Sequence, residues 1–253
     1  MSNIHQRGNK NSSPLGSTVL FTLRALDPIL QYGIFAHGIG VPLLAKLGLK
    51  AITDGPPIQT GIGFIDALQL SPYRLLLLTM VTGSTIKHNF WLLYTSEEAM
   101  SLSFALFVSV FNTVMNSSIS LLATTAFGNG GELSRPSVII GSTLYFVGVF
   151  TEMIAEVQRK KFKEDPRNKG KLYTERLWSI TRHINFTAYT AWRGGFALVG
   201  GGWLVGTGVS AFFLAGFIGA SIPELAGYCS KKYGGQWDNY KKKTPYQIIP
   251  GVY

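Results

Sequence analysis

Cysteine is almost absent from this sequence of 253 residues, since Cys229 is its single representative. One cysteine excludes an internal disulfide framework and any zinc site built from several cysteines. Charged residues are also scarce, at 14% of the chain, compared with about 25% in ordinary globular domains. Zinc-binding, phosphate-loop and nucleophile-elbow patterns are lacking too. The sequence therefore predicts no metal site.

Hydrophobic residues, in contrast, make up 46% of the chain and come in long uninterrupted runs. A helix that crosses a membrane needs about 20 predominantly apolar residues. Four such runs occupy Pro28–Leu49, Pro72–Tyr94, Met100–Phe127 and Ser137–Ala155. Each of the four is predicted to be a membrane-spanning helix.

A fifth apolar region, Gly194–Pro223, contains nine glycines and no ionisable residue. We expect it to form a tight hairpin of two crossings, with its turn near Gly200–Gly202 or Gly206–Gly208. The predicted fold is therefore an all-α polytopic transmembrane bundle with about six spans, within a range of about five to seven.

Basic residues predict the orientation of this bundle. Nine Lys or Arg and three acids lie between Arg159 and Arg182, and Lys231, Lys232 and Lys241–Lys243 follow the hairpin. Basic loops stay in the cytosol, so both segments and both termini are expected there. The net charge of +10 is interpreted as this orientation signal rather than as a nucleic-acid surface. The expected partners are the lipid bilayer and a lipophilic small molecule, with no nucleic acid.

The N-terminal segment Met1–Ser17 is polar and lacks the apolar core of a secretory signal. We therefore expect residues 1–26 to form a polar cytosolic tail and residues 27–151 to form transmembrane helices around a substrate. If the source is eukaryotic, the predicted location is the endoplasmic reticulum.

The strongest candidate for chemistry begins at the end of the fourth apolar run. Glu152, Glu156, Lys160 and Lys163 are spaced so that two carboxylates and two cations share one helical face. Such a face could hold a nucleotide, because carboxylates accept hydrogen bonds from ribose and cations offset phosphate charge. Charges at the membrane interface, paired along one helix, are the alternative interpretation.

A second candidate is Arg182-His183-Ile184-Asn185-Phe186, which follows Trp178. Guanidinium, imidazole and amide groups so close together could hold a phosphate, a planar ring and an amide. Taken singly, the same residues suit the membrane interface.

Three further segments belong with these two candidates: Asp165-Pro166-Arg167-Asn168, Ile222-Pro223-Glu224 and the closing Tyr240-Lys241. Together, the five segments resemble the steroid 5-alpha-reductase C-terminal family in its domain-of-unknown-function branch. The resemblance covers Glu152 to Pro250 and defines residues 152–253 as a region with a cytosolic nucleotide site.

The resemblance implies a membrane reductase that uses NADPH to saturate a carbon–carbon double bond conjugated to a carbonyl. The substrate would be sterol-like, fatty or terpenoid. By the same resemblance, the cofactor-binding residues are Glu152, Glu156, Lys163, Arg182, His183, Asn185 and Tyr240. No catalytic proton donor is predicted.

The central motif departs from the family pattern. The family has a sequence close to Arg-His-Pro-Asn-Tyr-Phe-Gly-Glu, whereas this chain has Ile184 at the Pro, Phe186 at the Tyr and Tyr189 at the final Glu. Two alternatives therefore stay open. One is an enzyme that uses S-adenosylmethionine and is similar to the isoprenylcysteine methyltransferases, and the other is a non-catalytic member of the family.

In the N-terminal half, Lys87-His88-Asn89 falls late in an apolar run. Ionisable residues within a span are costly, and they are functional suspects unless they lie at the interface. Asp27, His37 and Glu97-Glu98 are weaker candidates. The oligomeric state cannot be inferred from the sequence.

Overall fold

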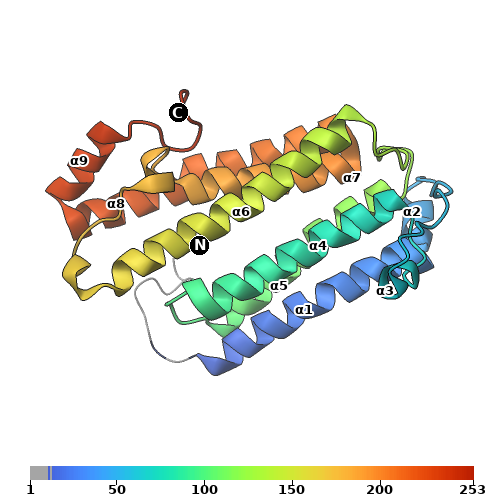
Figure 1. The fold of residues 1–253 in the computed structure, drawn as a ribbon, viewed down its shortest axis with the longest axis horizontal. Coiled ribbons are helices and arrows are strands. Elements are labelled where there is room, and N and C mark those ends of the chain that lie inside the picture. The colour runs from blue at the N-terminus through green and yellow to red at the C-terminus, as the bar shows by residue number, and fades with distance from the viewer. Residues whose placement is uncertain (1–10, 12) are drawn as a thin grey trace. The chain divides into compact units, whose positions relative to one another are not determined.

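The computed structural model describes residue 11 and residues 13–253. Helices account for almost all of its regular structure, and the described part contains an isolated bridge, Ala51–Thr125, but no β-sheet (Figure 1). The α-helices are α1 (Pro14–His37), α2 (Val41–Lys46), α3 (Gly63–Asp66), α4 (Pro72–Phe90), α5 (Leu102–Ala123), α6 (Pro136–Glu164), α7 (Ile184–Gly216), α8 (Ile222–Tyr233) and α9 (Gly235–Lys243). The predicted all-α class is confirmed.

The chain forms two compact units. The N-terminal unit contains the described residues up to Ile140 together with Phe196–Trp203, and the C-terminal unit contains Gly141–Gly195 and Leu204–Tyr253. Helices α6 and α7 each contribute to both units.

The first helix lies earlier in the chain than the sequence predicted. Helix α1 begins at Pro14 and ends at His37, so the expected span Pro28–Leu49 is wrong in position. The predicted tail, 1–26, lies partly outside the described residues, but from Pro14 onward it is helical. The error arose because Arg24 and Asp27 interrupt the apolar run. In the structure they form a salt bridge of 3.1 Å with no exposed side-chain surface.

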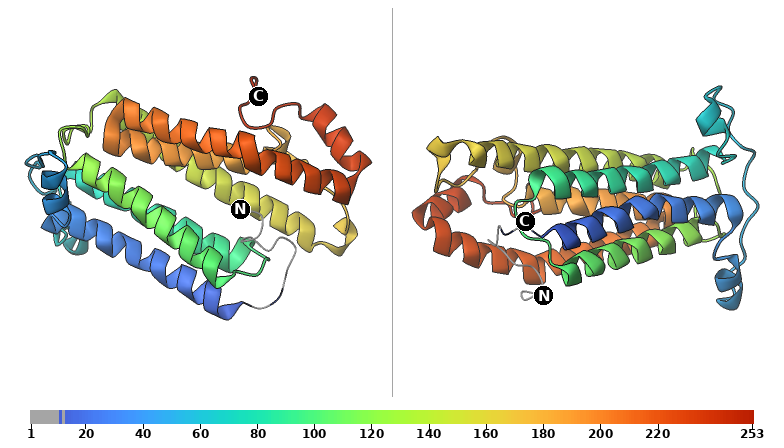
Figure 2. Two further views of the ribbon diagram at one scale, coloured as in Figure 1. Left: turned by 180° about the vertical axis from the view of Figure 1, so that it is seen from behind. Right: turned by 90° about the horizontal axis from the view of Figure 1, so that it is seen from below.

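In the N-terminal unit, α1 packs against α4 and α5 (Figures 1 and 2). Local sequence sets where two of these helices begin: Ser71 accepts a hydrogen bond from the Arg74 amide at the start of α4, and Ser101 accepts one from the Phe104 amide at the start of α5. Such N-caps satisfy amides that have no partner in the first helical turn.

Four helical segments of the described residues are long and apolar enough to cross a membrane: Pro14–His37, Leu102–Ala123, Pro136–Glu164 and Ile184–Tyr233. The predicted spans over Met100–Phe127 and Ser137–Ala155 correspond to α5 and α6. Helix α4 matches the predicted start at Pro72 but falls short of this apolar criterion, because its polar residues, Arg74 and Lys87 among them, lower its mean hydropathy.

The fourth segment is too long for one crossing. Its 50 residues would extend about 75 Å as a straight helix, whereas the hydrocarbon core of a bilayer is about 30 Å thick. The backbone breaks at Gly202, which has φ 72° and ψ −170°. Only glycine adopts this conformation readily, so Gly202 marks the turn.

Contacts in the C-terminal unit show that the two arms of this segment are antiparallel. A Cβ atom added to Gly194 would lie 2.0 Å from the Ser210 Oγ. The rings of Tyr189 and Phe213 are 5.1 Å apart, and those of Phe186 and Phe217 are 4.4 Å apart. Each pair is nearly symmetric about Gly202. The predicted hairpin is thus present, with its turn at the first of the two expected places. Counted as two arms, it raises the four apolar segments to five possible crossings, and a sixth crossing by α4 stays a prediction.

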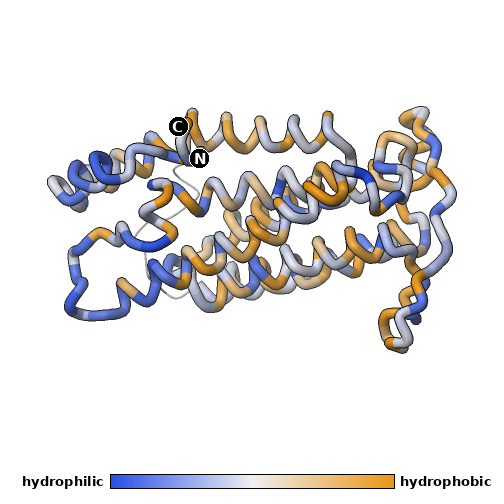
Figure 3. Tube along the Cα trace, turned by 45° about the horizontal axis from the view of Figure 1, so that its top comes forward, coloured by the Kyte–Doolittle hydropathy of each residue, from blue (hydrophilic) through white to orange (hydrophobic). Residues whose placement is uncertain are grey.

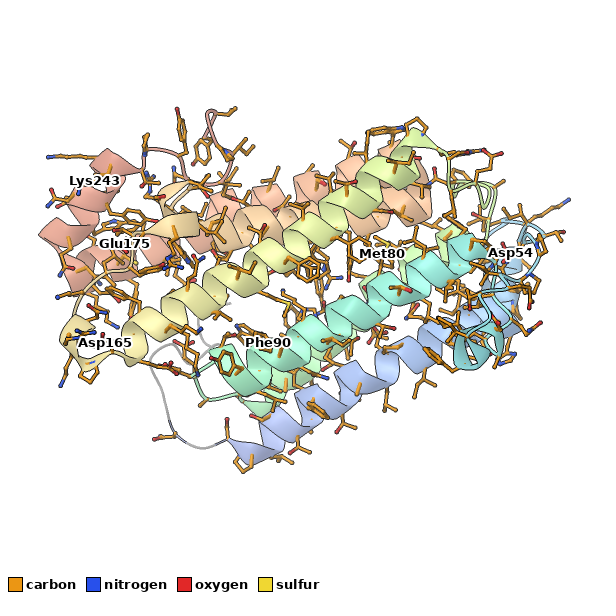
Figure 4. All side chains as sticks on the ribbon, in the orientation of Figure 1. Asp54, Met80, Phe90, Asp165, Glu175 and Lys243 are labelled. Atoms are coloured by element: carbon orange, nitrogen blue, oxygen red, sulfur yellow. The ribbon has the colours of Figure 1, made fainter. Side chains whose placement is uncertain are left out.

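Polar segments gather at one end of the C-terminal unit. Figure 3 shows hydrophilic residues in the loop after α6 and in α9, and Figure 4 places Asp165, Glu175 and Lys243 at that same end. Gln236 at the start of α9 connects the segments, since it accepts from the Leu172 amide at 3.0 Å and donates to the Gly170 carbonyl at 3.2 Å. The two basic segments therefore lie on the same side of the hairpin, as an even number of intervening crossings requires.

Candidate functional site

The two carboxylates predicted to hold a nucleotide both lie on α6, and each has a partner within the chain. Glu152 accepts a hydrogen bond of 2.7 Å from the indole of Trp192. Glu156 is 6% exposed and forms a salt bridge with Arg159. On this helical face, Glu152 thus joins α6 to α7, and Glu156 forms an ion pair along α6.

The cations further along α6 lie nearer to solvent. Lys160 pairs with Glu164 at 3.3 Å, and Lys163 is exposed. Beyond the helix, Asp165 accepts three hydrogen bonds from the Arg167 guanidinium, and these bonds lower the pKa of the carboxyl and raise that of the arginine. This end of α6 is positively charged, but several of its cations already have acidic partners.

Tyr240, predicted to bind the cofactor, joins α9 to the loop before α7. It is 3% exposed, and its hydroxyl donates to the Trp178 carbonyl. Burial raises the pKa of this phenol well above its usual value. Trp178 in turn donates its indole N–H to the Ala155 carbonyl at 2.9 Å, with the Arg159 guanidinium 5.1 Å from its ring. Helices α6 and α9 thus hold the loop that leads to α7.

Arg182 is held by the C-terminal residues of the chain. Its Nη1 atom donates to the carbonyls of Thr244 and Pro245 at 2.7 and 2.8 Å, and its amide donates to Tyr246 at 2.9 Å. Burial lowers the pKa of the guanidinium. The last residues of the chain therefore cover this arginine and use its hydrogen-bonding capacity.

His183 is buried directly before α7, with 1% of its surface exposed. Neither ring nitrogen has a hydrogen-bond partner among the residues that the structure describes. Burial, together with the charge of Arg182, lowers its pKa to about 4. The imidazole is thus neutral at physiological pH. Its ring stacks on Phe186, with centroids 5.5 Å apart.

From His183 a continuous series of rings extends into the hairpin. We define the aromatic row as His183, Phe186, Phe217, Tyr189 and Trp192. Beyond the first pair, centroid distances along the row are 4.4, 5.7 and 4.9 Å. The row joins both arms of the hairpin, because Phe217 belongs to the second arm.

The aromatic row accounts for two departures from the family motif. Phe186 stands where the resemblance expects Tyr, and Tyr189 stands where it expects Glu; both rings pack on Phe217. Asn185, the motif asparagine, is half-buried, and its Oδ1 atom has no partner in the described part of the chain. Compared with the family motif, Phe186 thus lacks the tyrosine hydroxyl and Tyr189 lacks the glutamate carboxylate, and each residue instead packs an aromatic ring on Phe217.

Arg193 is a candidate that sequence reasoning missed. It is fully buried, its guanidinium lies 4.2 Å from a Trp192 ring centroid, and its Nε donates to the Tyr189 hydroxyl at 3.3 Å. The signal was present in the sequence, since Arg193 is an isolated charge directly before the glycine-rich apolar region. The structure thus places a cation, two rings and Glu152 at the end of the aromatic row.

Comparison with known proteins identifies the family. Residues 78–244 match the family described as "Protein of unknown function (DUF1295)". This chain belongs to that family. DUF1295 is related to the steroid 5-alpha-reductases, so the predicted branch is confirmed. The match begins well before Glu152, and the family region therefore also includes most of α4 and all of α5.

Individual relatives of this DUF1295 chain are named either as a methyltransferase or as sterol reductases. A "Probable O-methyltransferase" from Ustilaginoidea virens is 41% identical over 233 residues, covering 89% of this chain and 82% of the relative. A Delta(14)-sterol reductase from Candida albicans is 33% identical over 91 residues, covering 33% of this chain but 19% of the reductase. A Delta(14)-sterol reductase from Arabidopsis thaliana is 25% identical and covers 49% of this chain. The sterol reductases are therefore distant relatives.

The N-terminal candidates lie on α4 and α1. Lys87 is 4% exposed in the last turn of α4, beside His88. Asp27 is buried at the middle of α1, and His37 ends that helix. Asp27 is therefore a stronger functional candidate than its sequence context indicates, because it lies deep within an apolar helix.

Proposed function

We propose that this DUF1295 protein is a membrane-embedded O-methyltransferase that uses S-adenosylmethionine. The observation that carries the proposal is the aromatic row, which ends on a buried imidazole that stays neutral. Aromatic faces attract cations, and a neutral imidazole does not repel them. S-adenosylmethionine carries a sulfonium cation and a flat adenine ring, both of which suit such a surface. The similarity to a probable O-methyltransferase over 89% of this chain supports the same proposal.

The residues present fit this cofactor better than one with several phosphates. A dinucleotide needs cations that are free to bind phosphate. At this site Arg159 is paired with Glu156, Arg167 with Asp165, and Arg182 with backbone carbonyls. The aromatic row and Asn185 would hold the rings and polar groups of S-adenosylmethionine.

When bound, the cofactor supplies a methyl group that is activated for transfer to an oxygen nucleophile. The acceptor hydroxyl would lose its proton to a base or to water as it takes up the methyl group. In this chain the row would orient the cofactor, and the apolar helices would admit a lipophilic acceptor from the bilayer. His183 and Trp192 at the two ends of the row are buried, whereas the three rings between them are half-buried. Electrostatic attraction is stronger where water is excluded.

The first experiment is calorimetric titration of detergent-purified protein with S-adenosylmethionine. Phe217→Leu removes one ring of the row. Its matched control is Phe212→Leu, which removes an exposed ring five residues earlier on the same arm. Losing a buried cation–π contact of about 1–2 kcal/mol weakens binding by about 5- to 30-fold. We expect that loss in Phe217→Leu and none in Phe212→Leu. Equal affinities in all three proteins contradict the site.

A second candidate is an NADPH-dependent reductase that saturates an enone in a sterol-like, fatty or terpenoid substrate. The sterol-reductase relatives favour it, as does the surplus of lysines around Lys163. In this case hydride from NADPH goes to the β-carbon of the enone, and a proton goes to the α-carbon. The nucleotide would enter from the cytosol at the basic end of the C-terminal unit, in a protein of the endoplasmic reticulum.

Titration with NADPH separates the two candidates. Lys163→Gln removes an exposed cation from this end, and Lys46→Gln is the matched control at an exposed position in the N-terminal unit. Binding of NADPH that weakens only in Lys163→Gln supports the reductase. Binding of neither cofactor overturns both proposals and leaves a non-catalytic member of the family.

A further inference from the structure

A cluster of polar side chains is buried within the apolar helices of the N-terminal unit. On α1, the residues Arg24, Asp27 and Gln31 recur at helical spacing and have 0–1% of their surface exposed. The neighbouring helix α5, which lies beside α1 in both views of Figure 2, contributes Asn116 and Ser117. Both helices are among the segments apolar enough to span a membrane.

The carboxylate of Asp27 organises this cluster. Its Oδ2 atom accepts from the Arg24 guanidinium at 3.1 Å and from the Asn116 amide at 2.6 Å, and its Oδ1 atom accepts from the Gln31 amide at 3.0 Å. Positive and negative charge therefore balance within the pair, and the centre of the cluster is neutral overall.

Around this neutral centre, four side-chain oxygens have no hydrogen-bond partner among the residues described. They are Oε1 of Gln31, Oδ1 of Asn112, Oγ of Ser109 and Oγ of Ser120. The residues on α5 are 0–3% exposed. They recur with Asn116 at spacings of three and four residues, which places them on one face of the helix.

The orientation of both amides is fixed by what they donate. The Nε2 atom of Gln31 donates to Asp27 and to Ser117, and the Nδ2 atom of Asn112 donates to the Val108 carbonyl. A carboxylate and a backbone carbonyl accept only, so the amide groups cannot be reversed. The side-chain oxygens of Gln31 and Asn112 are thus acceptors that have no donor in the described structure.

We propose that this face of α5, together with Gln31, binds the two hydroxyl groups of a lipophilic diol that enters from the bilayer. The unpaired oxygens extend from Ser109 to Ser120, about 16 Å along the helix, so one hydroxyl group reaches only part of them. Two carbonyl oxygens need a donor, and the two serine hydroxyls can either donate or accept, which is the pattern that complements an alcohol. A neutral ligand fits because Arg24 and Asp27 already balance each other. Burying unpaired polar groups in lipid-spanning helices is costly, so their presence indicates function rather than stability.

This binding site belongs to the N-terminal unit alone and does not depend on which cofactor the C-terminal unit takes. Its ligand need not be the molecule that is modified. Ordered water is the competing occupant, because water can also donate to these oxygens.

The test uses a long-chain diol that carries a photoreactive diazirine, and its dimethyl ether as the probe without a donor. Full-length protein in lipid nanodiscs is irradiated with each probe, and labelled peptides are identified by mass spectrometry. We expect labelling of α1 or α5 by the diol to exceed labelling by the ether. Equal labelling by both probes overturns the proposal.

Two variants on α5 sharpen this test. Asn112→Leu and Ser120→Ala each remove one unpaired oxygen, and Ser118→Ala is the matched control on the exposed side of the same helix. One hydrogen bond corresponds to a loss of about 2- to 10-fold in diol affinity. We expect that loss in the first two variants and none in Ser118→Ala.

The midpoint of thermal unfolding, measured without probe, distinguishes a loss of diol binding from a loss of protein stability. If the unpaired oxygens exist for binding, Asn112→Leu is at least as stable as the unaltered protein while its diol affinity falls. If the variant loses stability but keeps its diol affinity, the oxygens hold structural water and the proposal is wrong.

Discussion

The two units bury polar groups in opposite ways. In the N-terminal unit, Arg24, Asp27 and Gln31 are bonded into one cluster in the middle of the membrane helices. In the C-terminal unit, the His183 imidazole is buried without a hydrogen bond in the described structure and lies against an aromatic ring. The first arrangement favours ligands that donate hydrogen bonds, whereas the second favours flat or cationic ones. One chain thus offers two chemically different environments, and each can be perturbed separately.

The largest effect is expected where a charge loses its partner. Asp27→Leu leaves the Arg24 guanidinium buried without its carboxylate, which costs about 3–5 kcal/mol. Thermal or SDS-induced unfolding in detergent measures the loss. The double variant Arg24→Met/Asp27→Leu removes both charges and should recover most of the stability. If the single variant is as stable as the double, Asp27 is not the essential counter-charge.

The C-terminal unit should respond to acid through His183. Its pKa of about 4 lies below the usual value of about 6.5, so the unfolded chain takes up a proton first as the pH falls. Stability should therefore decrease between about pH 6.5 and pH 4, by up to about 3 kcal/mol from this group. Unfolding midpoints across that range, compared with those of His183→Gln, measure the contribution. A parallel decrease in the variant assigns acid sensitivity to other groups.

The hairpin turn should show an intermediate effect. Gly202→Ala places a side chain where φ is 72° and ψ is −170°, a conformation that costs residues other than glycine about 1–3 kcal/mol. Gly208→Ala is the control, because it lies on the helical second arm and a Cβ atom there meets nothing within 4 Å. We expect a lower midpoint of thermal unfolding for Gly202→Ala than for Gly208→Ala. Equal midpoints would argue against a turn at Gly202.

The smallest effect is expected for the exposed ion pair after α6. Asp165→Asn removes a carboxylate that is bonded to Arg167 in solvent, where water and salt weaken ion pairs. We expect no resolvable change in the unfolding midpoint, in contrast to Asp27→Leu. A large decrease would show that this loop contributes more to the fold than its exposure suggests.

Sequence reasoning was most accurate where a pattern had one physical interpretation. Long apolar runs predicted α5 and α6, and the glycines between Gly194 and Pro223 predicted the hairpin. It failed at α1, where Arg24 and Asp27 made a spanning helix look like a polar tail. A sequence shows that two charges are close in the chain, but not that they neutralise each other inside the fold.

For the candidate site, the motif predicted a segment but not the contacts that each of its side chains makes. Glu152 and Arg182 lie where the resemblance expected functional residues, yet their partners are Trp192 and the C-terminal carbonyls. The cofactor-binding roles of these residues stay predictions. Arg193 was missed because a single charge has no periodic pattern.

Hydropathy, glycine content and charge are properties of local composition, so they suffice to predict a helical membrane protein with its basic segments on one side of a hairpin, and the chain matches the DUF1295 family. That Phe186, Tyr189 and Phe217 form one row, and that Asp27 and Asn116 share a hydrogen bond, is known only from the folded structure. Phe217 is distant in the chain from Phe186 and Tyr189, as Asn116 is from Asp27, and contacts between distant residues depend on how whole helices pack rather than on any local preference.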